Sequence, residues 1–372
     1  MSVDFNTKDF LRAWNVVSPA AKSRTTKPVL TYVLLTGNGG RARLQASDGS
    51  QSVFGLVRDS FVGSSMLLPA ARFSQVLSQA GETFSLVATD SGVTVKTGRS
   101  KFNLSTESAE GFPFVGEFDS SRASSRSVSC EVLLRAIKTA ICAIDAGSVR
   151  YALGGVLLDF RDSRQLNVVS TDGRRLAAFK LAADGGGNRD DLAVVVPPES
   201  LRSVMRMLGE CGDGHCEVSA NENHAVFSVL DSGFEVRTNL VEGRFPDWRR
   251  TIAKHSTAYK STSVVLGDFL DAISSASVTV SQESKAIGIE ADAGSLSFAS
   301  QASGVGSSEV SIPVAWDHEK TRILVDPSNM ADILRTIDRS EVLSLEIADE
   351  KSAMFIRNGE FMTAVIMPLA KD

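Results

Sequence analysis

One pattern recurs three times along this chain, and this repetition constrains the fold more than any other feature. The first part of the pattern is a short amphipathic motif, which reads FLRA from Phe10, LLRA from Leu133 and FLDA from Phe269. A second motif has apolar residues three and then one position apart. It begins in turn at Phe73, Leu201 and Met330. Because such spacings place apolar side chains on one helix face, each copy is predicted to hold two helices.

A third repeated segment alternates between apolar and polar residues, as a half-buried strand does. It reads KFNLST from Lys101, FEVRTNL from Phe234 and FMTAVIM from Phe361. Prolines stand at or just before each second helix, which suits a first turn whose N–H groups have no partner. These prolines are Pro69, Pro197, Pro198 and Pro327. The sequence therefore predicts an α+β fold of three similar domains, 1–126, 127–254 and 255–372, each with two helices packed on antiparallel sheets.

A Phe-Pro pair closes each of the first two copies, at Phe112-Pro113 and at Phe245-Pro246. Serine-rich stretches follow both pairs, at 119–129 and 255–263, and their composition is typical of linkers. The first pair is interpreted as a strand terminator. The second is followed by Arg249 and Arg250, and these cations indicate a further role.

Composition excludes several classes of protein. The 372 residues are 43% hydrophobic and 22% charged, as in an ordinary globular protein, and no apolar run approaches the length of a membrane span. The N-terminus has an acidic residue where a signal peptide needs a basic region. Four cysteines lack Cys-x-x-Cys spacing, so we expect reduced thiols, mostly packed in the core, and no zinc site.

The sequence offers little support for catalysis. The Gly-rich stretch 184–191 lacks the Gly-Lys-Ser/Thr ending of a phosphate-binding loop, and its Asp190-Asp191 pair is interpreted as solvated charge. The four histidines lie in polar, loop-like surroundings and are expected at the surface. Asp-Gly at Asp48-Gly49 and Asp172-Gly173 predicts hairpin turns. We therefore expect no active site, no cofactor and no metal.

Six stretches, in order along the chain, resemble the bacterial β sliding clamp family, the β subunit of the replicative DNA polymerase III. They are GRSKFNLST (98–106), RYALGGVLLDF (150–160), STDGRRLA (170–177), VPPESLRSVMRML (196–208), LVEGRFPDWRR (240–250) and VIMPL (365–369). The resemblance implies the DNA clamp fold and a head-to-tail homodimer that forms a closed ring. It also implies that helices line the central hole and that double-stranded DNA passes through it, so that the polymerase is held on its template.

Basic residues recur at helical spacing, although the net charge of the chain is −5. Pairs three or four apart share one helix face and would give weak, sequence-independent attraction to phosphates. Asp271 is an exception, because it stands where the two sibling helices have arginine. The residues predicted to face DNA are Lys8, Arg12, Arg24, Arg72, Arg135, Lys138, Arg150, Arg202, Arg206, Arg335 and Arg339.

The resemblance also implies how the ring closes. An edge strand of the first copy, carrying Arg99, Lys101, Phe102 and Leu104, would meet the third copy of a partner near Val278 and Thr279. The third copy lacks the acidic run that the family sets against this basic edge. This leaves Glu309 as the clearest acidic candidate.

A partner-binding cleft between the second and third copies is implied as well. It would bind short tails of the Gln-Leu-x-Leu-Phe type from the polymerase catalytic subunit, clamp loader, repair polymerases, ligase and mismatch-repair proteins. Ala152, Arg174 and Asn329 depart from the family's usual residues, so we expect a wider and more basic cleft. Its residues would be Leu153, Thr171, Gly173, Arg174, Arg175, Leu176, Pro246, Arg250, Thr251, Val365, Ile366, Met367, Pro368 and Leu369.

Two other functions stay open at this point. A nucleic-acid enzyme could share the fold, although it would need a catalytic constellation that the sequence does not contain. A clamp-like regulatory paralogue could bind partners without closing a ring. Under the main interpretation the protein is a non-catalytic processivity factor in the cytoplasm, associated with the nucleoid and not with a membrane.

Overall fold

The structure is a computed structural model that describes residues 2–38, 40–61, 65–89, 92–113, 115–116, 118–145, 147, 151–185, 192–281 and 285–369. The chain forms two compact units. Unit 1 contains Met1–Leu134 and Ala183–Leu240, and unit 2 contains Arg135–Ala182 and Val241–Asp372. Both units contain part of the middle third of the chain, because strands of successive copies pair with each other within each unit.

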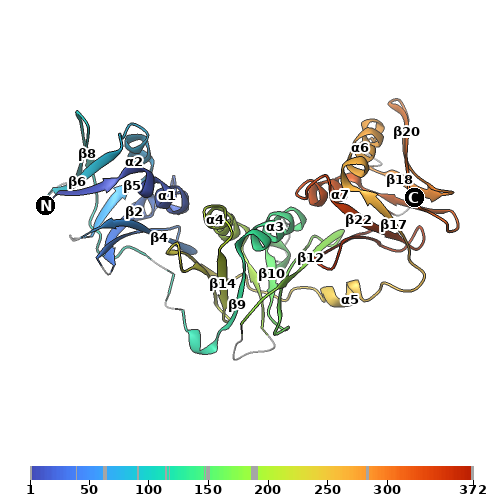
Figure 1. Ribbon diagram of the computed structural model, residues 1–372, viewed down its shortest axis with the longest axis horizontal. Coiled ribbons are helices and arrows are strands. Elements are labelled where there is room, and N and C mark those ends of the chain that lie inside the picture. Colours follow the sequence, from blue (N-terminus) through green and yellow to red (C-terminus); the bar gives the residue numbers. More distant parts are fainter. Residues whose placement is uncertain are drawn as a thin grey trace. The chain divides into compact units, whose positions relative to one another are not determined.

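Unit 1 consists of helices that pack on two antiparallel sheets (Figure 1). One sheet has the order β5-β2-β3-β4-β16-β15-β14-β9, and the other has the order β1-β6-β7-β8. The helices are α1 (Thr7–Val17), α2 (Ala70–Leu77) and α4 (Pro198–Gly209), with η1 (Ser18–Ala20), η2 (Pro28–Thr31) and η3 (Ser120–Arg122). The strands are β1 (Ser2–Asn6), β2 (Tyr32–Asn38), β3 (Arg41–Ser47), β4 (Gln51–Ser60), β5 (Met66–Pro69), β6 (Thr83–Thr89), β7 (Gly92–Thr97), β8 (Ser100–Ser105), β9 (Ser124–Ser129), β13 (Ala193–Val196), β14 (His215–Ala220), β15 (His224–Val229) and β16 (Phe234–Asn239).

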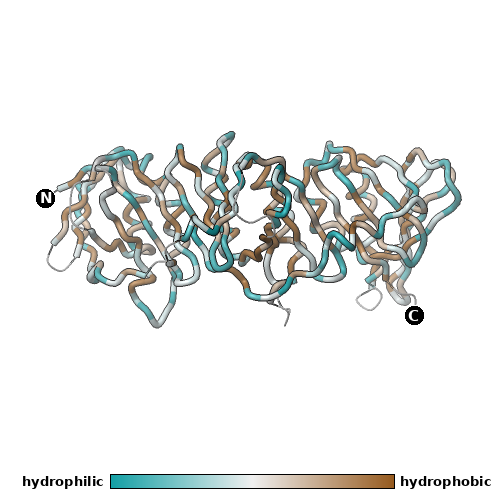
Figure 2. Tube along the Cα trace, turned by 90° about the horizontal axis from the view of Figure 1, so that it is seen from below, coloured by the Kyte–Doolittle hydropathy of each residue, from teal (hydrophilic) through white to brown (hydrophobic). Residues whose placement is uncertain are grey.

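The core of unit 1 shows why these segments become helices and strands. Asn6 caps α1 by accepting a hydrogen bond from the backbone N–H of Asp9 at 3.1 Å. The apolar face of α1 then places Phe10 and Trp14 against Phe73 of α2, with ring centroids 5.9 and 4.8 Å from that ring. Hydrophobic and hydrophilic stretches alternate along the trace (Figure 2), as elements with one buried face require.

Unit 2 repeats this architecture. One sheet contains the order β10-β11-β12-β24-β23-β22-β17, and the other has the order β20-β19-β18-β21. The helices are α5 (Trp248–Ile252), α6 (Leu266–Ala276) and α7 (Pro327–Leu334), with η4 (Ile141–Ala143), η5 (Tyr151–Gly154) and η6 (Ser277–Thr279). The strands are β10 (Val156–Asp159), β11 (Gln165–Thr171), β12 (Arg175–Ala182), β17 (Lys260–Val265), β18 (Ile287–Asp292), β19 (Ser295–Ala302), β20 (Gly306–Pro313), β21 (Thr321–Val325), β22 (Val342–Ile347), β23 (Met354–Asn358) and β24 (Met362–Ile366). The remaining helix, α3 (Cys130–Ala140), starts in unit 1 and ends in unit 2.

The two long sheets have corresponding joins. In unit 1, β4 pairs antiparallel with β16, and Val53 faces Val236. In unit 2, β12 pairs antiparallel with β24, and Leu176 faces Val365. Each long sheet therefore continues from one copy into the next through backbone hydrogen bonds.

The predicted helices and strands are confirmed at their expected places. FLRA, LLRA and FLDA lie in α1, α3 and α6, and the second motif lies in α2, α4 and α7. The alternating segments form β8, β16 and β24, and both Asp-Gly turns join adjacent antiparallel strands. The pairing of Arg335 with Arg339 on one helix face is wrong, because α7 ends at Leu334 and both residues follow it. No described helix is long and apolar enough to cross a bilayer.

Candidate functional site

Strand β8 forms one edge of its sheet in unit 1, because β7 alone pairs with it among the described strands. Its exposure alternates, with Phe102 and Leu104 half-buried and their neighbours exposed. Arg99 and Lys101 are exposed at the start of the strand. The free backbone edge can therefore accept a further strand, and the two apolar side chains can add contact area.

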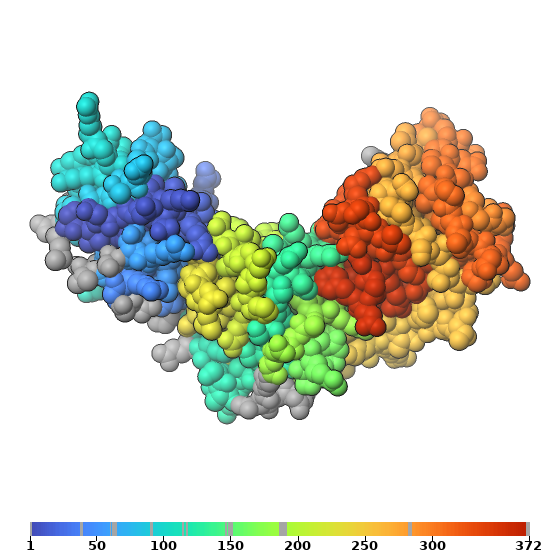
Figure 3. Space-filling view, viewed as in Figure 1, coloured from blue at the N-terminus to red at the C-terminus, as the bar shows by residue number. Residues whose placement is uncertain are grey.

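Strand β20 forms an edge of the corresponding sheet in unit 2. It carries the exposed Glu309, and its half-buried residues include Val310 and Ile312. Two exposed valines stand beside the beginning of the strand: Val278 is 76% exposed and Val305 is 59% exposed. In Figure 1 the hairpins that contain β8 and β20 project from their own units, and Figure 3 shows the projecting tip of the β7–β8 hairpin in cyan. Sequence reasoning identified Val278 but missed Val305, which follows no recognisable motif.

Thr279 has a different environment from Val278, the other residue of the third copy that was predicted to meet the partner. Its hydroxyl lies 2.6 Å from the Ser300 hydroxyl and donates to Ser308 at 2.9 Å. These bonds hold η6 against β19 and β20. Thr279 therefore helps to keep the edge strand in position, while Val278 remains open to contact.

The predicted DNA-facing cations fall into two groups. Five have exposed side chains for which the described residues provide no ion pair or side-chain hydrogen bond. These are Lys8, Arg24, Arg72, Lys138 and Arg335. Unpaired, exposed cations attract phosphates without fixing a register, which suits a sequence-independent contact. Arg150 lies outside the described residues, as does the pair Asp190-Asp191.

Arg12 and Arg135 belong to the second group, because each makes intramolecular contacts. The Arg12 guanidinium lies 5.3 Å from the Phe234 ring centre and donates to the Glu210 carbonyl at the end of α4, at 3.0 Å. Arg339 is similarly engaged, since its Nη2 lies 2.7 Å from Asp271. Asp271 replaces the arginine of its two siblings, and here it forms an ion pair with a residue that was itself predicted to face DNA.

Arg202 and Arg206 lie on α4 as predicted. Arg202 pairs with Glu199, whereas Arg206 is half-buried and donates to the Ser203 hydroxyl at 3.0 Å. The Arg206 Nε is buried and has no hydrogen-bond partner within the described part of the chain. Burial lowers the pKa of Arg206. The positive charge of Arg202 lowers it further, whereas the negative charge of Glu199 raises it. This pair therefore presents incompletely compensated positive charge.

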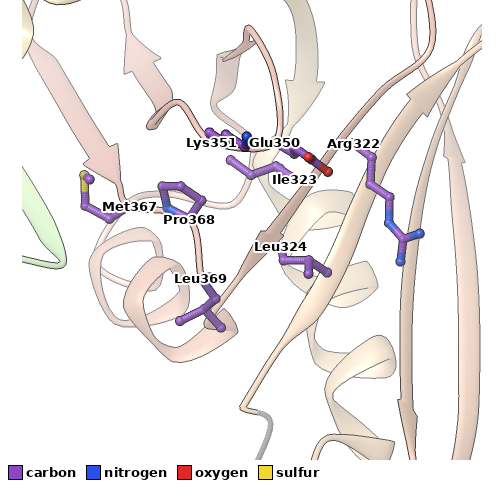
Figure 4. A pocket seen from close by; sticks show the side chains of 8 residues that line it. All are labelled: Arg322, Ile323, Leu324, Glu350, Lys351, Met367, Pro368 and Leu369. Atoms are coloured by element: carbon purple, nitrogen blue, oxygen red, sulfur yellow. The ribbon is translucent and has the colours of Figure 1, made fainter. Parts of the chain in front are cut away.

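An apolar cavity of about 490 Å³ lies in unit 2 at the end of the chain (Figure 4). Met367, Pro368 and Leu369, three of the predicted cleft residues, form one wall. The other wall, which sequence reasoning missed, comes from Arg322, Ile323, Leu324, Glu350 and Lys351. Figure 4 shows that Leu324 and Leu369 come from different segments of unit 2, and that the Arg322 guanidinium points away from Met367.

Backbone hydrogen bonds fix this wall. Met367 N–H donates to the Arg174 carbonyl at 2.8 Å, and Leu369 N–H donates to the Leu324 carbonyl at 2.8 Å. Met367 nevertheless keeps 43% of its surface exposed. An exposed methionine beside an apolar cavity can adapt to different apolar ligands.

The other predicted cleft residues do not line this cavity. Leu153, Leu176, Val365 and Ile366 are buried, and Thr171 is buried with its hydroxyl bound to the Arg175 carbonyl at 2.7 Å. Four others are exposed away from the lining, and Thr251 is half-buried. The exposed four are Gly173, Arg174, Pro246 and Arg250.

Arg175 is sequestered. Its side chain is 12% exposed and contacts Asp172 at 3.0 Å and Asp332 at 2.9 Å. It also approaches the carbonyls of Ser328 and Asn329 in α7. Arg175 therefore ties the turn before β12 to α7, and its guanidinium is already occupied.

The stretch around the second Phe-Pro is anchored by a buried carboxylate. Asp159, whose side chain is fully buried, accepts from the Trp248 indole at 3.1 Å and pairs with Arg249 at 2.7 Å. Arg161 also binds this carboxylate, at 2.6 Å. This network explains why the second Phe-Pro pair is followed by Asp-Trp-Arg-Arg, because α5 must be held against β10.

Among the described residues, no group of three His, Cys, Asp or Glu side chains is close enough together to hold a metal ion. Cys130 and Cys216 are buried, and Cys142 and Cys211 are half-buried, all as free thiols. Burial raises the pKa of the Cys130 thiol to about 11. Such thiols remain protonated at neutral pH and are poor nucleophiles.

Two domain models of one family match the sequence. The N-terminal domain of the DNA polymerase III beta subunit matches residues 1–116, and its central domain matches residues 127–247. Together they cover more than half of the chain.

Curated relatives are similar over nearly their full lengths. The beta sliding clamp of Proteus mirabilis is 27% identical over 370 residues, covering 97% of this chain and 98% of the relative. The beta sliding clamp of Escherichia coli K12 is 24% identical and covers 99% of this chain and 100% of the relative.

Solved structures share the fold. A sliding clamp of Pseudomonas aeruginosa bound to griselimycin has a TM-score of 0.90 at 24% identity, and the DNA polymerase sliding clamp of Bacillus subtilis has a TM-score of 0.88 at 21% identity. Both comparisons cover 100% of each chain.

Proposed function

The chain belongs to the DNA polymerase III beta subunit family, and we propose that it is a DNA sliding clamp. It encircles duplex DNA without reading sequence and tethers the replicative polymerase, which confers processivity. The observation that carries this proposal is the match of two successive domain models of this family to the chain. The α+β architecture, with corresponding joins in both units, supports it.

The protein acts as three tandem domains, with boundaries at 1–126, 127–254 and 255–372. The support is the threefold recurrence of two helices and an alternating strand along the chain, with a strand join between each pair of successive copies. The central domain model begins at residue 127, in accord with the first boundary.

Two copies of the chain close a ring head to tail. In this arrangement β8 of one copy pairs with β20 of the other, which extends both sheets across the interface. Phe102 and Leu104 then contact the region of Val278, Val305 and Val310, while Arg99 and Lys101 approach Glu309. Pairing two free edges satisfies backbone N–H and C=O groups that water alone would otherwise solvate.

Duplex DNA is held weakly and retained by the topology of the ring. The free cations on the helices, such as Lys8, Arg72 and Lys138, supply a salt-screened attraction that permits sliding. The half-buried Arg206 adds a cation whose charge is incompletely compensated. Arg12, Arg135 and Arg339 contribute less, because their guanidinium groups are engaged within the chain.

Partner tails of the Gln-Leu-x-Leu-Phe type dock in the cavity beside Met367 and Leu369. Its apolar lining favours two aliphatic or aromatic side chains, and each would contribute roughly 1.5–3 kcal/mol on burial. Ordering a flexible tail offsets part of this gain, so an affinity of about 1 µM is expected. The polymerase catalytic subunit, clamp loader, repair polymerases, ligase and mismatch-repair proteins would carry such tails, and the clamp itself performs no catalysis.

Primer extension tests this function. On a singly primed circular template with the cognate polymerase and clamp loader, adding the protein should lengthen the products of a single binding event at least about tenfold. Product lengths that do not depend on the protein would contradict the proposal.

A further inference from the structure

Unit 1 contains two adjoining hollows, of whose lining residues the proposed function uses only Arg12. Their volumes are about 350 and 330 Å³, and both are lined by Leu56, Leu230 and Gly233. We name the pair the arginine groove after the cations that line it. These cations are Arg12, Arg41, Arg43, Arg58 and Arg237.

The turn between β15 and β16 shapes this groove. Gly233 has a φ of 69° and packs so closely on Leu56 that a Cβ atom there would lie 2.5 Å from the leucine Cδ1. Glycine alone tolerates both this conformation and this approach. The turn thereby holds Leu230 outward, with 80% of its surface exposed. An apolar side chain so fully exposed at a turn has no packing role in unit 1.

The positive charge of the groove is only partly compensated. Arg41 and Arg58 are exposed, and neither makes an ion pair or a side-chain hydrogen bond within the part of the chain that the structure describes. Both sit on neighbouring strands, β3 and β4, at the same end of the sheet. Two free guanidinium groups at one end of a hollow attract carboxylates or phosphates.

Arg41 and Arg58 line the hollow of about 330 Å³. The hollow of about 350 Å³ adds Arg43 and Arg237, which pack on an aromatic ring. Arg43 and Arg237 both lie over the Phe54 ring, 4.2 and 5.2 Å from its centre, and Arg237 pairs with Glu235. Burial lowers the pKa of Arg43, Glu235 opposes this shift, and the neighbouring charge of Arg237 adds to it. An anion placed beside Arg43 would therefore relieve an unfavourable desolvated charge.

We propose that the arginine groove binds an acidic peptide segment of a partner protein, in which carboxylates flank one aliphatic or aromatic side chain. The carboxylates pair with Arg41, Arg58 and Arg43, and the apolar side chain packs on Leu230 and Leu56. Each hollow has room for one or two side chains, and the excess of arginine over Asp231 and Glu235 supplies the charge complementarity.

Several features favour a peptide over a nucleic acid. Asp231 and Glu235 line the hollows and would repel a continuous phosphate backbone. The aromatic rings at the groove, Phe54 and Phe234, are 5% and 2% exposed, so bases could not stack on them. Leu230 offers an apolar contact that a phosphate backbone would not use. The groove also lies in unit 1 and shares no residue with the cavity of unit 2.

The test is a selection of displayed 12-residue peptides on the full-length protein, with an excess of Gln-Leu-x-Leu-Phe peptide present to occupy the cavity of unit 2. Recovered peptides should be rich in Asp and Glu around one Leu, Ile or Phe. In fluorescence anisotropy, the double variant Arg41→Glu with Arg58→Glu should bind the tightest of these peptides at least about tenfold more weakly, since two attractive contacts become repulsive. Their affinity should also fall as salt is raised.

Two further variants distinguish binding in the groove from a general effect of the net charge. Arg122→Glu with Arg164→Glu changes the net charge equally at exposed positions outside the groove, and it should leave the affinity unchanged. Leu230→Ser should weaken binding at least about threefold and leave the melting temperature unchanged, because that side chain is not packed. It also keeps the test valid if the double arginine variant fails to fold.

Three outcomes would overturn the proposal. One is a selection that recovers no acidic peptides, and another is an equal loss of affinity in the Arg122 and Arg164 control. The third is binding of a 20-nucleotide single strand that Arg41→Glu with Arg58→Glu abolishes while peptides are unaffected, which would assign the groove to nucleic acid. Because the Gln-Leu-x-Leu-Phe peptide is measured in parallel, failure here is distinguishable from failure of the proposed clamp function.

Discussion

Arg12 and Arg135 each lie over a phenylalanine ring that belongs to the next copy of the repeat. The guanidinium of Arg12 lies 5.3 Å from the Phe234 ring centre, and that of Arg135 lies 5.1 Å from the Phe361 ring centre. Arg135 also pairs with Glu341 at 3.2 Å, as Arg12 binds the Glu210 carbonyl at 3.0 Å. Each arginine therefore connects the first helix of one copy to the next copy. Arg12 reaches Phe234 of β16 and the end of α4, and Arg135 reaches Phe361 and Glu341, which directly precede β24 and β22.

Arg135→Ala should lower the free energy of unfolding by about 1 kcal/mol, because one cation–π contact and one partly exposed ion pair are lost. Urea denaturation monitored by circular dichroism measures this change. Lys138→Ala, three residues along the same helix and exposed, should change the free energy by less than about 0.5 kcal/mol. Equal effects of the two substitutions would show that Arg135 is not a connecting residue.

Asp159→Asn tests the anchor of the stretch that follows the second Phe-Pro pair. Burial alone would raise the pKa of Asp159, but hydrogen bonds from Arg161 and the charges of Arg249 and Arg161 outweigh it and lower that pKa below its usual value. The contribution to stability is therefore present above about pH 4, the unfolded value, and is lost as pH falls toward the folded pKa. At pH 7 the substitution should cost about 3 kcal/mol, because Arg249 and Arg161 lose their charged partner.

The pH dependence of this cost distinguishes the charge from packing. Between pH 7 and pH 5 the difference in unfolding free energy from wild type should be constant, and it should shrink below about pH 4. Glu242→Gln, at an exposed position shortly before the second Phe-Pro pair, is the matched control and should have little effect at any pH. A cost of Asp159→Asn that persists unchanged at pH 3 would argue against the ionic anchor.

Leu104→Arg should convert the dimer to a monomer, because it places an unpaired charge against the apolar residues of β20. Sedimentation equilibrium at about 1 µM protein, in the affinity range of stable interfaces, measures the change. Asn103→Arg is the control on the other face of β8, where Asn103 is exposed and accepts from Thr94 at 2.8 Å. A monomeric wild-type protein would contradict the pairing of β8 with β20.

The double variant Met367→Ala with Leu369→Ala should bind a labelled Gln-Leu-x-Leu-Phe peptide at least about a hundredfold more weakly, because two apolar wall side chains are removed. Fluorescence anisotropy measures the affinity, and sedimentation confirms that the dimer remains. Val342→Ala removes a comparably exposed apolar side chain outside the cavity and should have no effect. Unchanged affinity in the double variant would locate the partner site elsewhere.

Much of the fold follows from local sequence patterns. The threefold motifs predict α1, α3 and α6 because helical periodicity is a property of neighbouring residues. The alternation of KFNLST likewise identifies β8, although its position at a sheet edge came from the resemblance to the family. Arg335 and Arg339 show that spacing alone does not determine where a helix ends. They have helical spacing, but α7 ends before both of them.

The sites depend on contacts that spacing does not encode. Arg12 and Arg135 have the spacing of solvated cations, yet Phe234 and Phe361, far along the chain, cover their guanidinium groups. The second wall of the cavity includes Leu324 of β21, whereas Met367 follows β24, and the residues of this wall carry no motif. Such partners are determined by how the sheets are joined, which a single sequence does not specify.

Topological retention on DNA tests the central claim most directly. The protein is loaded by a clamp loader on nicked circular DNA and on linear DNA of the same length, and the fraction that remains bound is measured by gel filtration as salt is raised to about 1 M, where charge attraction is screened beyond about 3 Å. A sliding clamp should remain on the circle, leave the linear molecule through its ends, and leave the circle once a restriction enzyme cuts it. Equal loss from circular and linear DNA at high salt would contradict the account, because binding would then depend on charge and not on encirclement.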